Sequence, residues 1–282
     1  FSECPVLQSD VILPEGLESL GSGAFSNCYS LRTVAIPEGS VTLGGYLFAN
    51  CQSLSNVKLG EGITVLPNSI FFGCSSLKRL ALPESLVEIE KSAFAASGIV
   101  KLHIPANVQQ IHWDVFVDAE RLIGITVDAD NPYLAAQGNM IFTKDMKKLL
   151  VSTPGIAAEL VIPDGVETIG KDAFALNCTI KSVVIPDSVR TIEDEAFIAT
   201  EITRVIMGDG VETIGKYAFA PGYTQSGHTV NQTYGKDTDG AYYKSRYATA
   251  GSLRTLRLSS GLKEIGECAF VGARFLEKLI LP

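Results

Sequence analysis

Apolar positions recur along the chain at a nearly constant spacing, in a unit close to L-x-x-V-x-I-P-x-x-V-x-x-I-G-x-x-A-F-x-x-C. The first four phenylalanines of this unit are 23 residues apart, and the next follows after 22. A period of this length predicts a solenoid, in which each unit buries its apolar face only by stacking on its neighbours. The repeated phenylalanines are Phe25, Phe48, Phe71, Phe94, Phe116, Phe174, Phe197, Phe219 and Phe270.

The first half of each unit predicts one short strand. In LRTVAI (Leu31 to Ile36) the apolar residues alternate with others, and such alternation with β-branched residues is typical of a strand. We expect stacked copies to pair as a parallel sheet with strands about 4.8 Å apart. A proline ends the strand in most units, because it has no N–H for the ladder. These prolines are Pro14, Pro37, Pro83, Pro105, Pro163 and Pro186.

The second half of the unit predicts turns and core residues. The phenylalanine is expected to be the largest buried side chain of each unit. Cys28, Cys51 and Cys74 fall at one repeat position and are expected to be small buried thiols, whereas Cys178 stands one residue later in its unit. The glycine before the Ala-Phe pair suits a turn with positive φ. It occurs as Gly21, Gly170, Gly215 and Gly266.

This pattern resembles the leucine-rich repeats of the BspA type. The stretch IPDGVETIGKDAFALNC (Ile162 to Cys178) carries the spacing almost complete, and the resemblance extends from about Ile12 to Pro282. It implies a mainly β, curved, right-handed solenoid with short turns and helical pieces and with a parallel sheet on its concave face. It also implies adhesion and binding at the surface of bacterial cells, and it supplies neither catalytic residues nor a particular ligand.

We therefore expect residues 1–282 to form a single solenoid of about 11 units of about 23 residues. Two stretches interrupt the period, and function is more often found in such stretches than in the repeats. Residues 125–155 are expected to be a degenerate repeat with a strand, a loop and a hairpin in which MIFT pairs with KLLV.

The second interruption, residues 221–250, is a Tyr-rich insertion with small polar residues. Tyrosine gives a large contact area at low cost in rotamer entropy, so this composition suits an adaptable recognition loop. A loop that packs on the solenoid or moves freely is the alternative. The predicted ligand-binding tyrosines are Tyr223, Tyr234, Tyr242, Tyr243 and Tyr247.

Strand periodicity also predicts which side chains face the concave side. The residues on either side of the central V of L-x-x-V-x-I point away from the core. Eighteen such positions in nine units include seven basic residues and no acidic one. This favours an anionic partner, although solvated basic residues that discourage edge pairing would give the same pattern. The predicted ligand-binding residues of this face are Lys58, Arg79, Lys101, His103, Arg204, Arg257 and Lys278.

Composition and charge narrow the function classes. A net charge of -8 argues against nucleic-acid binding, and no apolar run is long enough to span a bilayer. The chain opens without a targeting signal and closes on LILP, the start of another unit. We therefore expect a piece of a longer protein that is displayed on the cell surface or secreted after removal of its signal.

Catalytic and metal-binding patterns are not found in the sequence. There is no G-x-S-x-G, H-E-x-x-H or G-x-x-x-x-G-K-[ST] stretch, and the cysteines lack the C-x-x-C spacing of a zinc site. His103, His112 and His228 lie in different units, and His112 is expected to be structural or simply exposed. We expect no enzymatic activity, no cofactor and no bound metal.

Two functions from different classes fit these expectations. The first is a non-enzymatic adhesion or binding module that takes a protein or an anionic glycan, such as a host matrix protein or glycoprotein, on its concave face and Tyr-rich insertion. The second is a structural spacer that presents another domain and binds nothing itself. The thirty-residue insertion favours the first, because a spacer has no use for it. The oligomeric state is left open.

Overall fold

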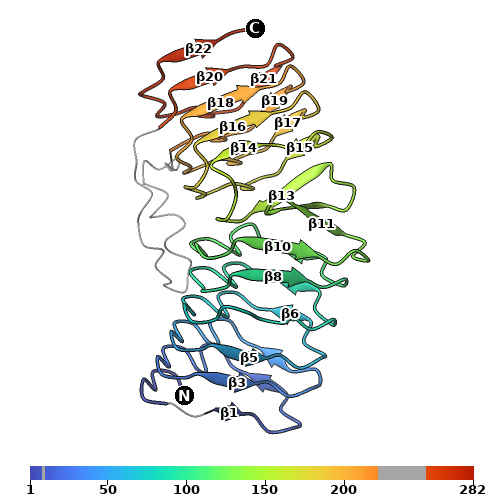
Figure 1. The fold of residues 1–282 in the computed structure, drawn as a ribbon, viewed down its shortest axis with the longest axis vertical. Helices are drawn as coiled ribbons and strands as arrows, with labels where there is room; N and C mark the ends of the chain where they lie inside the picture. The colour runs from blue at the N-terminus through green and yellow to red at the C-terminus, as the bar shows by residue number, and fades with distance from the viewer. Residues whose placement is uncertain (8–9, 222–251) are drawn as a thin grey trace. The chain divides into compact units, whose positions relative to one another are not determined.

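The computed structural model describes residues 1–7, 10–221 and 252–282 (Figure 1). Backbone contacts divide the chain into two compact units, which are described separately below. Unit 1 comprises Phe1–Lys144 and Thr153–Gly155, and unit 2 comprises Asp145–Ser152 and Ile156–Pro282. All of the Tyr-rich insertion except Pro221 lies outside the described residues, and so do its five tyrosines and His228. The single continuous solenoid stays a prediction.

Unit 1 coils through two kinds of strand. The longer strands pair in parallel, β1 with β3, β3 with β5 and β8 with β10, and β11 and β12 form an antiparallel hairpin. Two-residue strands form separate parallel ladders, β2–β4 and β6–β7–β9. The strands of unit 1 are β1 (Val11–Ile12), β2 (Ser19–Leu20), β3 (Thr33–Ala35), β4 (Thr42–Leu43), β5 (Asn56–Lys58), β6 (Val65–Leu66), β7 (Glu88–Ile89), β8 (Lys101–Ile104), β9 (Gln110–Ile111), β10 (Gly124–Val127), β11 (Leu134–Gln137) and β12 (Met140–Thr143).

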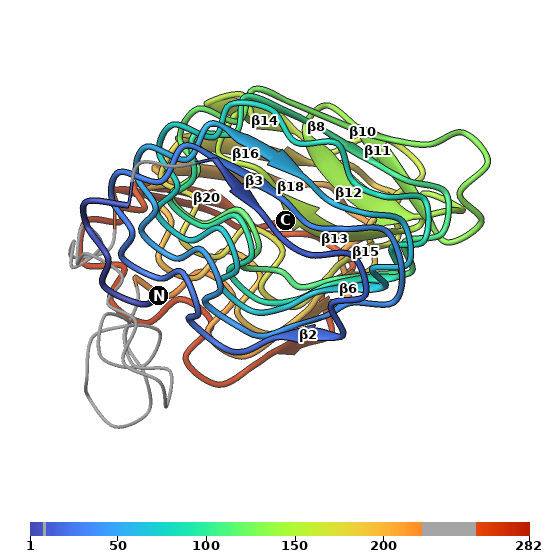
Figure 2. The same cartoon turned by 90° about the horizontal axis from the view of Figure 1, so that it is seen from below.

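Unit 2 repeats this plan with two continuous parallel sheets. One sheet has the order β14-β16-β18-β20-β22 and the other β13-β15-β17-β19-β21. In Figure 2, β16, β18 and β20 lie on one side of the coil, and β13 and β15 lie on another. The strands are β13 (Lys148–Ser152), β14 (Glu159–Val161), β15 (Thr168–Ile169), β16 (Ser182–Ile185), β17 (Thr191–Ile192), β18 (Arg204–Met207), β19 (Thr213–Ile214), β20 (Thr255–Arg257), β21 (Glu264–Ile265) and β22 (Lys278–Ile280). The predicted leucine-rich repeat solenoid with parallel sheets is confirmed.

The ladder of two-residue strands is a feature that the repeat pattern did not predict, because V-x-x-I-G was taken as part of a turn. In unit 2, Thr168, Thr191 and Thr213 align across the ladder and point outward. The isoleucines that follow them, at 169, 192 and 214, are fully buried. Two residues are enough for one outward and one inward side chain, but they are too few to show alternation in the sequence.

The segment around each repeated phenylalanine is a run of turns, and the described residues contain no helix, so the expected helical pieces are absent. Asp172 and Leu176, on either side of Phe174, have φ of 57° and 61°. The N–H groups of Phe174 and Leu176 donate to Ala196 and Ile198 of the next unit, whereas Ala173 and Ala175 donate within their own turns. Positive φ at every fourth residue thus prevents a helix and directs alternate N–H groups to the next coil.

The phenylalanines stack as expected and form the centre of each core. In unit 1, Phe48 and Phe71 have ring centroids 5.8 Å apart, and in unit 2 Phe174 and Phe197 are 4.7 Å apart and nearly parallel. Cys28, Cys51 and Cys74 are buried beside this stack, and the Cys51 thiol donates to the carbonyl of Phe25. Burial raises the pKa of Cys51 to about 12. All six cysteines are free thiols.

The expectation of positive φ at Gly21, Gly170, Gly215 and Gly266 is wrong, because none of them has it. Close approach of the neighbouring coil explains the glycine at positions 170, 215 and 266 instead, whereas a Cβ on Gly21 would meet nothing within 4 Å. A Cβ on Gly170 would lie 2.5 Å from the carbonyl oxygen of Leu149, and one on Gly215 would lie 2.4 Å from the nitrogen of Asp194. Positive φ is found in the turn after the proline, for example at Gly165, with φ of 92°.

The first interruption contains the predicted strands, MIFT as β12 and KLLV within β13, and an additional one. β12 forms its antiparallel hairpin with β11 across Gly138 and Asn139, whose φ values of 57° and 63° suit a two-residue hairpin turn. Asn131 is fully buried next to this hairpin. Its Nδ2 donates to the carbonyls of Pro105 and Val108, and its Oδ1 accepts from two N–H groups of its own loop.

One predicted strand does not form. Residues 77–82, LKRLAL, lie in the register of the longer strands but have no strand conformation, so β5 and β8 are not paired through them. This segment has no β-branched residue, whereas β3, β5 and β8 each contain at least one. The lower β propensity of Leu, Lys, Arg and Ala accounts for the break.

Candidate binding surfaces on the strand faces

The outward side chains of the longer strands in unit 1 form a polar surface, here called strand face 1. Its register is set by Thr33 opposite Asn56, Ala35 opposite Lys58, Lys101 opposite Gly124 and His103 opposite Thr126. Lys58, Lys101 and His103 are exposed, as expected, and Arg79 is exposed on the segment that does not form a strand.

Two of the four predicted residues of strand face 1 are held by acidic neighbours. Lys58 Nζ lies 3.0 Å from Glu38 Oε1, and this hydrogen bond, together with the N–H of Glu61, lowers the pKa of Glu38. His103 contacts Thr126 Oγ1 at 3.0 Å and Asp128 Oδ2 at 3.6 Å. Arg79 and Lys101 form no ion pair with any described residue.

The five-stranded sheet of unit 2 presents a different outward surface, here called strand face 2 (Figure 1). One row of outward side chains runs Glu159, Ser182, Arg204, Thr255, Lys278 across the sheet. The row beside it runs Val161, Val184, Ile206, Arg257, Ile280. Val161 and Val184 are 64% and 42% exposed, so this row begins with exposed apolar residues on adjacent strands.

The basic residues of strand face 2 also divide into paired and unpaired ones. Arg257 donates to the carboxylate of Asp209, with Nη2 3.0 Å from Oδ1, and to the carbonyl of Met207. Hydrogen bonds from Ser260 and then from Arg257 lower the pKa of Asp209. Arg204 and Lys278 are exposed and form no ion pair with any residue that the structure describes.

Strand β14 was not part of the predicted face, and it adds one acidic and one apolar side chain to strand face 2. Its Glu159 is the acidic member of a row that is otherwise neutral or basic, and its Val161 extends the apolar row. The strand directly follows the first interruption, so its unit lacks the usual leucine three residues before the central position. The residues LVIP before the Asp-Gly turn are the signal that could have identified it.

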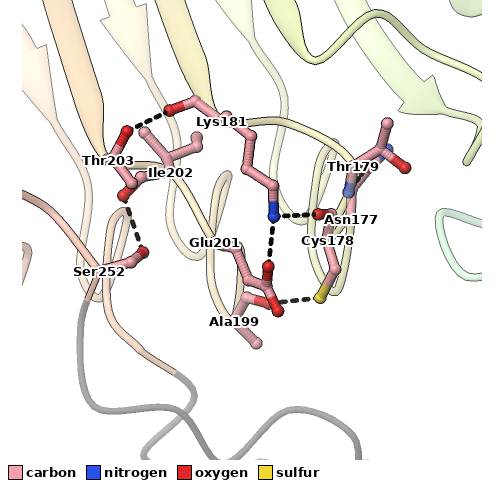
Figure 3. Close-up of polar contacts among 9 residues, drawn as sticks. All are labelled: Asn177, Cys178, Thr179, Lys181, Ala199, Glu201, Ile202, Thr203 and Ser252. Carbon is pink, nitrogen blue, oxygen red and sulfur yellow. Dashed lines mark hydrogen bonds and ion pairs between the residues drawn. The ribbon is translucent and has the colours of Figure 1, made fainter.

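The chain after the Tyr-rich insertion is tied to a preceding coil (Figure 3). Ser252, at the end of the insertion, donates to the carbonyl of Ile202 at 2.8 Å. Lys181 Nζ donates to the carbonyl of Cys178 and to the carboxylate of Glu201. The cavity next to Ser252 and Pro221 has a volume of about 20 Å³, which is enough for a water molecule but not for a ligand.

One group of side chains contains the residue types of a nucleophilic site but not its contacts. Asp114 is buried and accepts from the hydroxyl of Ser92 at 2.8 Å, while His112 Nδ1 lies 2.6 Å from the same carboxylate. The serine thus bonds to the aspartate rather than to the histidine, so the serine–histidine–aspartate contacts of a catalytic triad are not formed. The described residues also contain no group of three or more His, Cys, Asp or Glu that could hold a metal ion.

Solved structures with the same fold come from bacteria. The pneumococcal vaccine antigen PcpA aligns with a TM-score of 0.58 and 20% identity over 94% of this chain, which spans 54% of that protein. A leucine-rich cell surface protein of Faecalibacterium prausnitzii aligns with a TM-score of 0.56 and 23% identity, over 93% of this chain and 76% of that one. A leucine-rich repeat protein of Eubacterium ventriosum aligns with a TM-score of 0.64 and 20% identity, over 97% of this chain and 73% of that one.

A search of curated proteins found no match. No helix among the described residues has the length and apolar character needed to cross a membrane. The model of the BspA type leucine-rich repeat region matches residues 1–123 and 156–246, in six copies and over more than half of the chain. The chain therefore belongs to the BspA-type leucine-rich repeat family.

Proposed function

We propose that this chain is a non-enzymatic binding protein, displayed on the bacterial surface or secreted, and that strand face 2 docks a protein partner. The observation that carries the proposal is the apolar row in which Val161 and Val184 are exposed and Ile206 is half-buried. It lies next to Arg204 and Lys278, which form no ion pair with a described residue. The similarity to a leucine-rich cell surface protein of Faecalibacterium prausnitzii supports the surface location.

The apolar row favours a protein over a glycan as the main partner. Scattered exposed apolar residues are normal, but here they stand on adjacent strands in one row, at the spacing of a sheet. Their removal from water by a partner would contribute about 25 cal/mol for each Å² buried. The fold gains nothing from their exposure, because the inward residues Val183 and Val205 already fill the core.

The charge of strand face 2 selects an acidic partner. Arg204 and Lys278 lie in the row beside the apolar one, and Arg257 retains donor groups next to Asp209. In a chain of net charge -8, this local positive potential attracts an anionic surface and orients it during encounter. The five tyrosines of the insertion are proposed as secondary contacts.

The test is binding of the whole chain to an array of extracellular-matrix proteins, serum glycoproteins and glycans, at about 0.05 M and about 0.5 M NaCl. Val184→Asp and Arg204→Glu remove the apolar and the basic part of strand face 2. Ala35→Asp is the matched control, because it makes the same kind of change at the equivalent position of strand face 1. We expect a protein ligand whose binding weakens with salt and falls at least about tenfold in both variants but not in the control.

A further variant, in which residues 221–250 are replaced by a short turn, measures the contribution of the Tyr-rich insertion. If the folded chain binds nothing on the array at either salt concentration, the binding proposal fails and the spacer function replaces it. If the ligand is a glycan whose binding ignores Val184→Asp, the assignment to the apolar row is wrong.

A further inference from the structure

Unit 1 carries a second candidate site, on the ladder of two-residue strands rather than on strand face 1. The surface of β6–β7–β9 holds a hollow with a volume of about 380 Å³, and β6 is labelled in Figure 1. Small-molecule sites in proteins have volumes of about 300–1,000 Å³, so a single ring compound fits. The polar side chains that line the hollow are those of Asn68, Glu88, Glu90, Lys91, Gln110 and His112.

Two of the lining residues place a carboxylate next to a carboxamide. Glu88 and Gln110 are register partners on β7 and β9, so both side chains leave the same face of the ladder about 4.8 Å apart. Neither side chain has a hydrogen bond or an ion pair with a described residue. Together they offer acceptors from both groups and two N–H donors from the amide.

Two other lining residues, Glu90 and His112, are oriented by hydrogen bonds within the protein. Glu90 accepts from the backbone N–H of Asn68 through Oε2, at 2.7 Å, which leaves its other oxygen for a ligand. Asp114 holds the ring of His112 through Nδ1, and Asp114 is itself fixed by Ser92. Nε2 of His112 is therefore the ring nitrogen that is left to contact a ligand. Asp114 fixes the orientation of the ring, and such preorganisation lowers the entropic cost of binding.

The geometry points to a neutral sugar as the ligand, and we propose that this hollow binds a pyranose ring through two neighbouring hydroxyl groups. Each hydroxyl can donate to Glu88, to Glu90 or to Nε2 of His112 and accept from the amide of Gln110, which matches the mixture of acceptors and donors in the lining. The lining combines two carboxylates with the ammonium group of Lys91, so it favours neither a strongly anionic nor a strongly cationic ligand. This inference does not depend on the proposed function, because β6, β7 and β9 belong to another ladder than the strand faces.

The experiment is saturation-transfer NMR on the whole chain with four probes, the methyl pyranosides of mannose, galactose, glucose and xylose. We expect transfer to at least one of them. Glu88→Ala and Gln110→Ala should each weaken binding roughly fivefold or more, the loss expected for one hydrogen bond of about 1 kcal/mol. Each residue is a surface residue of its own two-residue strand. Thermal melts of the variants check that the fold is kept.

Glu264→Ala is the matched control. Glu264 is also the first residue of a Glu-Ile strand, β21, but it lies in unit 2 and does not line the hollow. Its substitution should leave sugar binding unchanged. The inference is overturned if none of the four probes binds at concentrations of tens of millimolar, or if Glu88→Ala and Gln110→Ala bind as the parent does. It is also overturned if Glu264→Ala loses binding to the same extent, since the site would then lie elsewhere.

Discussion

The two units have the same kind of core and differ on their surfaces. Unit 1 has a broken longer-strand sheet, and the acidic residues Glu38 and Asp128 hold two of its exposed basic residues. Unit 2 has a continuous five-stranded sheet with an apolar row, and its Arg204 and Lys278 form no ion pair with any described residue. Inward positions must fit the coils above and below, so they vary little between units. Outward positions carry no such constraint, and there a binding surface can arise on one unit alone.

The largest effect on stability is expected from removing one of the stacked rings. Comparing the two units tests whether the closer ring stack of unit 2 makes its core more stable. Phe197→Ala and Phe71→Ala each remove a buried ring from the middle of a stack, and each should lower the free energy of unfolding by about 3–5 kcal/mol. Because the rings are closer and more parallel around Phe197, its loss should cost about 0.5–1.5 kcal/mol more. Urea unfolding of both variants gives the comparison. A larger loss for Phe71→Ala would show that ring spacing does not distinguish the cores.

The next largest effect on stability is expected from substituting one of two glycines that occupy the same repeat position. Gly215→Ala places a methyl group 2.4 Å from the backbone nitrogen of Asp194, so it should destabilise the protein by about 1–3 kcal/mol. Gly21→Ala meets nothing within 4 Å and needs no positive φ, so its effect should stay within about 0.5 kcal/mol. Thermal unfolding measures both. Equal losses would mean that backbone conformation, and not close approach of the coils, selects glycine there.

The buried thiols of unit 1 should make stability depend on alkaline pH. Burial raises the folded pKa of Cys51 to about 12 from a usual value of 9.0, and it also raises the pKa of Cys28 and Cys74. The contribution of the neutral Cys51 thiol to stability is therefore complete below pH 9 and is lost as the pH rises toward 12, by up to about 1.4 kcal/mol per pH unit. Cys28 and Cys74 act in the same direction. Urea unfolding of the parent and of Cys51→Ala between pH 8 and about pH 10.5 should show a shallower slope for the variant. Identical slopes would contradict this account of Cys51.

The smallest effect is expected for the paired lysine of strand face 1. Lys58 and Glu38 form an exposed ion pair, which water and salt screen, so Lys58→Ala should shift the melting temperature by no more than about 1–2 °C. A scanning calorimetry trace of the variant checks this. A shift well beyond that range would show that the pair stabilises unit 1 and is not only a neutralised surface charge.

Most of the fold could be predicted from the sequence because its determinants are periodic. The alternation in LRTVAI predicted β3, and the recurring phenylalanines and cysteines predicted the core positions. Features set by neighbouring coils were missed. The two-residue strands are too short to show a period, and a glycine required by close approach looks the same in sequence as one required by positive φ.

The candidate site could be predicted only in part from the sequence, for a related reason. The outward direction of Lys58 or Arg204 follows from strand alternation alone. The acids that neutralise some of these residues come from neighbouring coils, and Asp209 is 48 residues before Arg257. Pairing over that distance depends on the stack, so it required the structure. The apolar row was missed because Val161 belongs to a strand without the usual repeat pattern.

The central claim is that strand face 2, and not strand face 1, docks the partner. The most direct test is biolayer interferometry with the protein ligand that the array identifies, comparing the parent with Val184→Asp and Ala35→Asp. The account predicts that Val184→Asp weakens binding at least about tenfold and that Ala35→Asp leaves it unchanged. Equal binding by the parent and Val184→Asp, or a loss only in Ala35→Asp, would contradict it.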